Sequence, residues 1–133
     1  MTQEDNKLLL RDLCAKLPYG VKGLITYNVD KDIFTIKGIY NDVLSLSDAK
    51  RCYVEDFRPY LFPLSSMTDI QKKEYNILRD DAPTYHYEFG DIIEDMELYD
   101  NWKSIDYLNA HYFDYRGLIE KGLAIDATDL NVY

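Results

Sequence analysis

The amino-acid sequence predicts one α+β domain over residues 1–133, with an N-terminal helix, a small twisted antiparallel sheet and a helical C-terminal half. Three observations lead to this prediction. Apolar residues of the first segment recur at helical spacing, residues after Gly20 change to a period of two, and helix-start signals return from Thr68 onward. A chain of 133 residues is also long enough to bury a core as a single domain without a metal or a disulfide.

The first segment carries the start and stop signals of a helix. Thr2 can cap its N-terminus, and Pro18 and Gly20 end it. Apolar residues at helical spacing predict one buried face, which consists of Leu9, Leu10, Leu13, Cys14 and Leu17. Cys14 is therefore predicted to be a small core residue.

Four short strands are predicted between residues 21 and 57. Their ranges are Val21–Tyr27, Ile33–Tyr40, Val43–Leu46 and Arg51–Phe57. The short turns between them are typical of an antiparallel meander, which could close into a small SH3-like barrel. The next stretch, Arg58–Leu64, contains two prolines. We expect it to be an apolar connector that packs on the sheet, because proline does not fit a central strand.

The remaining residues predict mainly helices. Thr68 and Gln71 have capping-box spacing, and the helix that they begin runs to about Leu78 with Ile70 and Ile77 on one side. Residues 84–89 alternate aromatic and polar side chains, which indicates a short strand, and a further helix is expected after residue 91.

The last helices are predicted from residue 102 onward. One helix face is expected to consist of Trp102, Ile105, Leu108 and Tyr112. Asp114 then caps a short helix over Tyr115–Lys121, which Gly122 ends. Residues 123–125 are expected to pack against the core.

The negative charge of the chain is concentrated in one segment. Between Asp80 and Asp100 lie eight acidic residues and no Lys or Arg, which accounts for −8 of the formal net charge of −9; the other residues hold 16 acids and 15 bases. One interpretation is a solvated face that keeps the protein soluble. The other is a docking surface for a basic protein, because aromatic side chains alternate with the carboxylates. The predicted partner-binding residues are Tyr85, Tyr87, Glu88, Asp91, Glu94, Asp95, Glu97, Tyr99 and Asp100.

Several classes of function lack their motifs. The two cysteines and two histidines have no zinc spacing, and no calcium loop or phosphate-binding glycine loop is present, so we expect neither metal nor cofactor. No basic stripe favours direct contact with nucleic acid. The N-terminus lacks a signal peptide, no apolar run is long enough for a membrane, and two isolated cysteines suit a reducing compartment. We therefore expect a cytoplasmic protein.

Three stretches carry a resemblance. They read LLLRDLCAKLPYGV over residues 8–21, RPYLFPLSSMT over 58–68 and LNAHYFDYRGLIEKGLA over 108–124. Together they resemble a family of short uncharacterised proteins encoded by phages, prophages and mobile elements of gut bacteria. The resemblance implies an accessory gene product acting in a bacterial cytoplasm, and it assigns no catalytic or binding residue.

The sequence therefore predicts a non-enzymatic protein-interaction module with an acidic and aromatic docking patch. One alternative is a small hydrolase or nuclease-like enzyme in which His111 and Asp114 form a general-base pair. A helix-capping role for Asp114 competes with that interpretation. Another alternative is a mimic of nucleic-acid charge that occupies a host nucleic-acid-binding protein.

Overall fold

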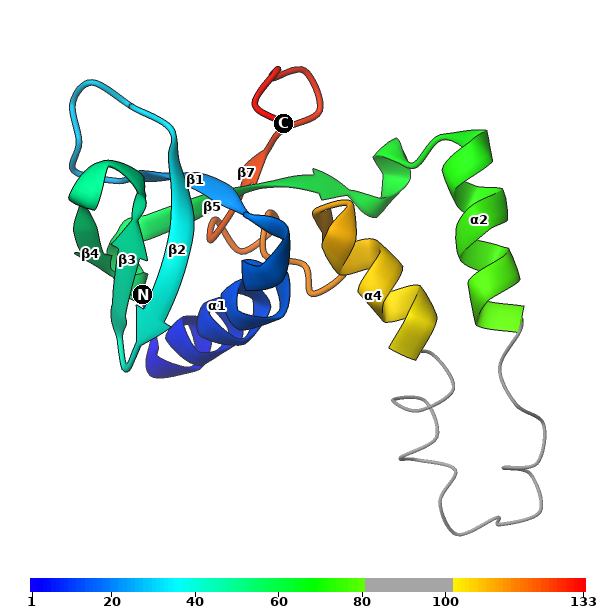
Figure 1. Cartoon of the computed structure of the whole chain (residues 1–133), viewed down its shortest axis with the longest axis horizontal. Coiled ribbons are helices and arrows are strands. Elements are labelled where there is room, and N and C mark those ends of the chain that lie inside the picture. The colour runs from blue at the N-terminus through cyan, green and yellow to red at the C-terminus, as the bar shows by residue number, and fades with distance from the viewer. Residues whose placement is uncertain (81–101) are drawn as a thin grey trace, which may run out of the picture.

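The computed structural model describes residues 1–80 and 102–133 (Figure 1). Its α-helices are α1 (Gln3–Lys16), α2 (Asp69–Asp80) and α4 (Trp102–Ala110). Its strands are β1 (Lys22–Ile25), β2 (Phe34–Tyr40), β3 (Val43–Leu46), β4 (Arg51–Tyr53), β5 (Phe57–Pro63), β6 (Phe113–Asp114) and β7 (Ile125–Asp126). Short 3-10 turns are η1 (Leu17–Tyr19), η2 (Ser47–Ala49), η3 (Val54–Asp56) and η4 (Leu64–Ser66). The predicted α+β class and the N-terminal helix are confirmed.

Helix α1 begins where the sequence predicts. The hydroxyl of Thr2 accepts the backbone N–H of Asp5 at 3.0 Å, which satisfies one of the free donors of the first turn. The buried face differs from the predicted one, because it consists of Leu9, Asp12, Leu13 and Lys16. These positions follow i, i+3, i+4 and i+7 spacing. Cys14 lies off this stripe and is exposed, so its predicted place in the core is wrong.

The four predicted strands of the meander are present; β3 has the predicted bounds, and β1, β2 and β4 are shorter. Strands β1 to β4 pair in sequence order and antiparallel, which gives the sheet order β4-β3-β2-β1-β5. A register shift between Ile36 and Gly38 bends the β2–β3 pair. Among the described residues the sheet does not close on itself, so the SH3-like barrel is not confirmed.

Strand β5 overturns the expectation of a connector over Arg58–Leu64. It pairs antiparallel with β1 and parallel with β6 and β7, so it lies at the centre of the fold. Antiparallel neighbours alternate between hydrogen-bonded and non-bonded pairs, and the Thr26 N–H donates to the Asp56 carbonyl at 2.8 Å. Along β1 and β5 the pairs alternate from that bonded pair, so the pair of Gly23 with Pro59 is a non-bonded one. The proline is tolerated because β1 requires no donor from it.

The hydroxyl of Tyr133 completes the β1–β5 ladder at the next bonded position. It accepts the backbone N–H of Lys22 at 2.8 Å and donates to the carbonyl of Tyr60 at 2.9 Å. The side chain of residue 133 therefore bridges two strands that lie far from it in sequence.

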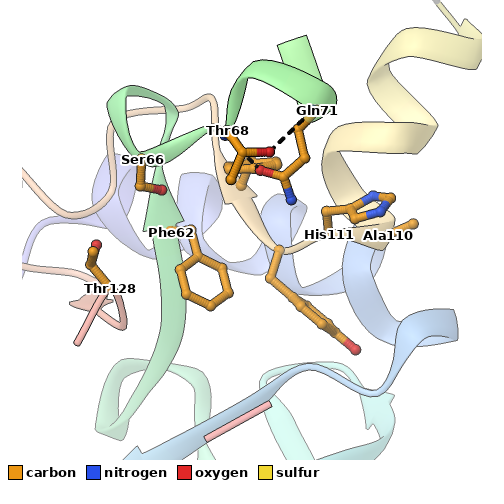
Figure 2. A pocket seen from close by; sticks show the side chains of 9 residues that line it. Phe62, Ser66, Thr68, Gln71, Ala110, His111 and Thr128 are labelled. Atoms are coloured by element: carbon orange, nitrogen blue, oxygen red, sulfur yellow. Dashed lines mark hydrogen bonds between the residues drawn. The ribbon is translucent and has the colours of Figure 1, made fainter. Parts of the chain in front are cut away.

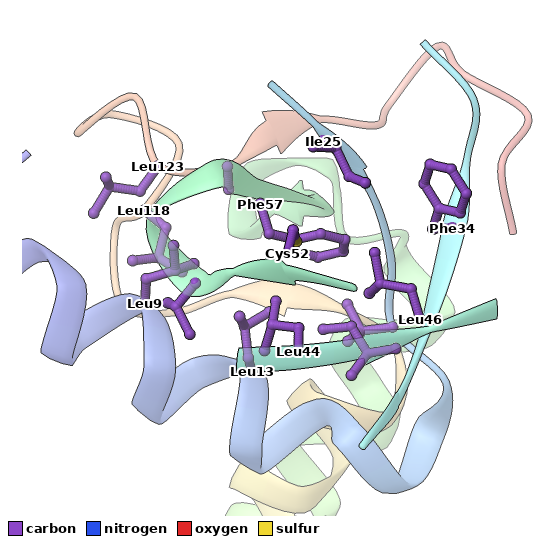
Figure 3. Close-up of a cluster of buried hydrophobic side chains, with 14 of the residues drawn as sticks. Leu9, Leu13, Ile25, Phe34, Leu44, Leu46, Cys52, Phe57, Leu118 and Leu123 are labelled. Atoms are coloured by element: carbon purple, nitrogen blue, oxygen red, sulfur yellow. The ribbon is translucent and has the colours of Figure 1, made fainter. Parts of the chain in front are cut away.

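The hydrophobic core lies between α1 and the sheet (Figure 3). Leu9 and Leu13 point from the helix toward Leu44 and its neighbours on the strands, and Leu118 and Leu123 from the C-terminal segment complete the cluster (Figure 3). All five of these leucines are buried. The C-terminal segment is thus part of the core, as predicted for residues 123–125, of which Leu123 and Ala124 are buried.

The segment after α4 is less helical than predicted. Over Tyr115–Lys121 the backbone forms turns, and no regular helix is present. The Asp114 carboxylate nevertheless accepts backbone N–H groups, from Leu118 at 2.8 Å and from Ile119 at 2.9 Å. The predicted helix is therefore absent, although Asp114 satisfies backbone donors as a cap does, and Gly117 and Gly122, both with positive φ, mark tight turns.

Candidate functional site

The predicted docking residues lie outside the described part of the chain. This holds for Tyr85, Tyr87, Glu88, Asp91, Glu94, Asp95, Glu97, Tyr99 and Asp100, and for the strand and helix predicted over 84–99. What the structure describes is the pair of helices at which that segment begins and ends.

Helices α2 and α4 pack side by side and project from the sheet (Figure 1). The Tyr107 hydroxyl donates to the Glu74 carboxylate at 2.7 Å and joins the two helices. Burial, and the hydrogen bond to Glu74, raise the pKa of Tyr107 to about 12. The C-terminal end of α2 and the N-terminal end of α4 lie at the same end of the molecule, away from the sheet (Figure 1). The acidic segment is therefore attached at the outer end of this helix pair.

The helix pair exposes large apolar side chains near that end. Trp102 is 59% exposed and Ile77 is 67% exposed. Ile70, nearer the start of α2, is 71% exposed. The sequence places these residues on apolar helix faces, but neither helix presents them to the core. In α4 the buried positions are Ser104, Leu108 and Asn109.

His111 and Asp114 do not form the pair that an enzymatic function would require. His111 follows α4, and its Nδ1 lies 2.9 Å from the Tyr107 carbonyl oxygen. Asp114 is buried, and its two oxygens each accept a backbone N–H of the following turn. The carboxylate is therefore occupied as a cap, and no hydrogen bond joins it to the imidazole among the described residues.

A buried ionic cluster joins α1 to the C-terminal segment. The Lys16 amine donates to the Asp12 carboxylate at 2.6 Å and to the Asn109 side-chain carbonyl at 3.2 Å. Arg116 donates to the same Asp12 oxygen at 2.7 Å and to the Tyr115 hydroxyl at 2.8 Å. The Tyr115 ring lies under both cations, 4.7 Å from the Lys16 nitrogen and 4.6 Å from the Arg116 guanidinium carbon.

The electrostatics of this cluster are those of a structural clamp. Asp12 and Lys16 have no exposed surface. Burial lowers the pKa of Lys16 from its ordinary value of 10.5, and the nearby Asp12 carboxylate opposes that effect. A substrate cannot reach an amine that is fully enclosed, so we assign the cluster to stability and not to catalysis.

Sequence reasoning missed this cluster, although a signal was present. Asp12 and Lys16 are an i, i+4 pair of opposite charge that shares the helix face of Leu9 and Leu13. Charged residues are almost never fully buried unless they are paired. The distant partner, Arg116, could not be identified from spacing alone.

No cluster of three or more potential metal ligands occurs among the residues that the structure describes. Within the same ranges, none of the helices has the length and hydrophobicity needed to span a membrane. No family model matches the chain, and neither curated proteins nor solved structures gave a significant match.

Proposed function

We propose that this protein is a non-enzymatic interaction module, an accessory product of a phage or mobile element, that docks on a basic protein partner. One observation carries the proposal. Eight acidic residues without a compensating base are attached at the outer end of a helix pair that exposes Ile77 and Trp102.

Charge and apolar area favour different steps of such a contact. A local negative field speeds the encounter with a basic surface, and large apolar side chains supply affinity after docking. Ile77 and Trp102 lie within three residues of the ends of the acidic segment, at Asp80 and Asp100. Both contributions are therefore offered at the same end of the molecule.

The proposal is tested with the immobilised full chain in a bacterial lysate. We expect captured proteins to be strongly basic, with isoelectric points above about 9. Capture should weaken as salt rises from about 0.1 M to 1 M, because the Debye length falls from about 10 Å to about 3 Å. The variant Glu94→Lys, Asp95→Lys, Glu97→Lys should lose the same proteins.

A matched control separates local charge from total charge. Asp30, Asp32 and Asp129 are exposed and distant in sequence from the segment. Reversing all three to Lys changes the net charge from −9 to −3, as does the first triple variant, because each reversal adds two charges. We expect this control to retain capture. Equal loss in both variants, or capture that survives reversal of Glu94, Asp95 and Glu97, contradicts the proposal.

The apolar contribution is tested separately with Trp102→Ala. This change leaves the charge untouched, and the wild-type side chain is already exposed, so the fold should be unaffected. We expect weaker capture of the same basic proteins with an unchanged dependence on salt.

A further inference from the structure

A cavity of about 360 Å³ lies where the end of β5, the start of α2 and the end of α4 meet (Figure 2). This volume falls within the range of small-molecule sites, roughly 300–1,000 Å³. The cavity is lined by Phe62, Ser66, Thr68, Gln71, Ala110, His111, Tyr112, Phe113 and Thr128. No Lys, Arg, Asp or Glu is among them. The lining thus combines aromatic walls with polar groups that carry no fixed charge.

The capping box of α2 orients one polar group toward the cavity. The Gln71 side-chain oxygen accepts the backbone N–H of Thr68 at 2.9 Å, and the backbone N–H of Gln71 donates to the Thr68 hydroxyl at 3.2 Å. Because the amide oxygen is used by the cap, the NH₂ group is turned the other way, toward the space between Phe62 and His111 (Figure 2). The cap therefore presents a fixed hydrogen-bond donor.

His111 lines the same cavity and carries one acceptor. Its Nδ1 lies 2.9 Å from the Tyr107 carbonyl oxygen, which can only accept a hydrogen bond, so Nδ1 carries the proton. In the neutral imidazole, Nε2 is then the acceptor. The ring is held in place by stacking on Tyr107, with centroids 4.1 Å apart. Gln71 lies in α2 and His111 directly follows α4, and both side chains line the same cavity.

The aromatic wall of the cavity is also fixed in position. Tyr112 has a φ of 61°, an unfavourable conformation for a residue other than glycine. Its ring stacks on Tyr133 with centroids 3.7 Å apart, and its hydroxyl donates to the Tyr19 carbonyl. Such strain persists only where the surroundings hold the residue, and it is often found at binding sites. On the neighbouring side, Phe62 and Phe113 pack edge to face.

We propose that this cavity binds a small, uncharged, planar heterocycle of the nucleobase type. A ring carbonyl accepts from the Gln71 amide, the adjacent ring N–H donates to His111 Nε2, and the ring face lies on the aromatic wall. The absence of a cation in the lining argues against a phosphorylated ligand. This proposal is independent of the docking function of the acidic segment.

The test is a titration of the full chain with uracil and hypoxanthine, followed by two-dimensional NMR of the backbone amides. We expect saturable shifts centred on residues that line the cavity. The matched ligand is 1,3-dimethyluracil, which keeps the flat ring and both carbonyls but has no N–H. It should bind about tenfold more weakly, because the His111 acceptor is then left without a hydrogen-bond donor.

Two variants remove one polar group each. Gln71→Glu keeps the capping oxygen but replaces the NH₂ donor by an acceptor, so α2 retains its cap. His111→Phe keeps a flat ring and removes Nε2. We expect at least about tenfold weaker binding of uracil in each. Gln3→Glu, the same change in the first turn of α1, is the control and should bind like the wild type.

Three results would overturn the proposal. These are the absence of saturable shifts with either base at millimolar concentration, equal binding of 1,3-dimethyluracil, and unchanged binding by folded Gln71→Glu. The last result is decisive even if His111→Phe fails to fold.

Discussion

Replacement of Gly23 by alanine should separate β1 from β5. A Cβ atom at this position would lie 2.4 Å from the Cζ atom of Phe57 and 2.5 Å from the Arg58 carbonyl oxygen. Ordinary contacts between such atoms are about 3.5–4.0 Å. The overlap is therefore about 1 Å, and one of the overlapped atoms belongs to the backbone of the central strand.

The expected loss of stability follows from these distances. Overpacking a core costs about 1–3 kcal/mol, and we place Gly23→Ala at the upper end because the Arg58 carbonyl cannot rotate away. Alanine also stabilises by about 0.4–1 kcal/mol, since it restricts the unfolded chain. The net loss in the free energy of unfolding should be about 2–2.5 kcal/mol. For a chain of this size we expect Tm to fall by about 7–9 °C.

Urea titration and thermal denaturation followed by circular dichroism measure this effect. Gly38→Ala is the matched control, because Gly38 also lies in a strand and its nearest atom, Ser45 Cβ, is 3.9 Å from the ideal Cβ. We expect Gly38→Ala to match the wild type or to gain up to about 1 kcal/mol. If Gly23→Ala stays within about 0.5 kcal/mol of the wild type, or if both variants lose equally, the close approach of β1 and β5 is refuted.

Three further predictions concern buried and titrating groups. Asp12→Asn should lower the free energy of unfolding by about 3–5 kcal/mol in urea titrations, because it leaves the cations of Lys16 and Arg116 facing each other. Lys16→Met should cost less, since the Asp12 carboxylate keeps its arginine partner. A larger loss for Lys16→Met than for Asp12→Asn would refute the assignment of this ionic cluster to stability. A maleimide at pH 7.5 should label Cys14 within minutes and Cys52 only after unfolding, because Cys14 is exposed while burial raises the pKa of Cys52 to about 11. Rapid labelling of both cysteines, detected by mass spectrometry, would contradict this prediction. The raised pKa of Tyr107, about 12 against 10.0 ordinarily, means that its contribution to stability is complete below pH 10 and is lost as pH rises toward 12. The urea midpoints of wild type and Tyr107→Phe should therefore converge between pH 9 and pH 11.5, and a constant difference would show that this hydroxyl is not involved.

Local signals in the sequence predicted the elements that local chemistry determines. The caps at Thr2 and Thr68, the stop at Gly20 and the alternation of β2 are properties of a few adjacent residues, and all of them are present. The β5 strand was missed because a rule for isolated prolines ignores register. Only the pairing partner decides whether a missing N–H faces a neighbour that needs it.

Side-chain burial was the harder prediction, and it failed in both directions. Cys14 was expected inside and lies outside, whereas Lys16 was not among the residues expected in the buried face and is fully buried. The deciding contacts, from Asn109 and Arg116, are about 100 residues away in sequence. Periodicity indicates that a helix has a buried face, but the identity of that face depends on such distant partners. The paired polar groups of the cavity, at Gln71 and His111, are equally nonlocal.

The arrangement around β5 has a consequence for biosynthesis. Strand β1 reaches β5 early, but β7 is added across 65 residues, from Tyr60 to Ile125. One edge of the central strand therefore stays unpaired until about 65 further residues have been synthesised, and an unpaired edge favours aggregation. The Leu61 carbonyl accepts the Ala127 N–H, so the backbone groups of Leu61 point to the edge of β5 that faces β7. Alternate residues of a strand direct their backbone groups to the same edge, so Pro59 and Pro63 also face β7. Because two N–H donors are missing, the unpaired edge of β5 is a poor template for strands of other chains. The prolines therefore protect the nascent protein from aggregation, and the Leu61 carbonyl remains available for β7.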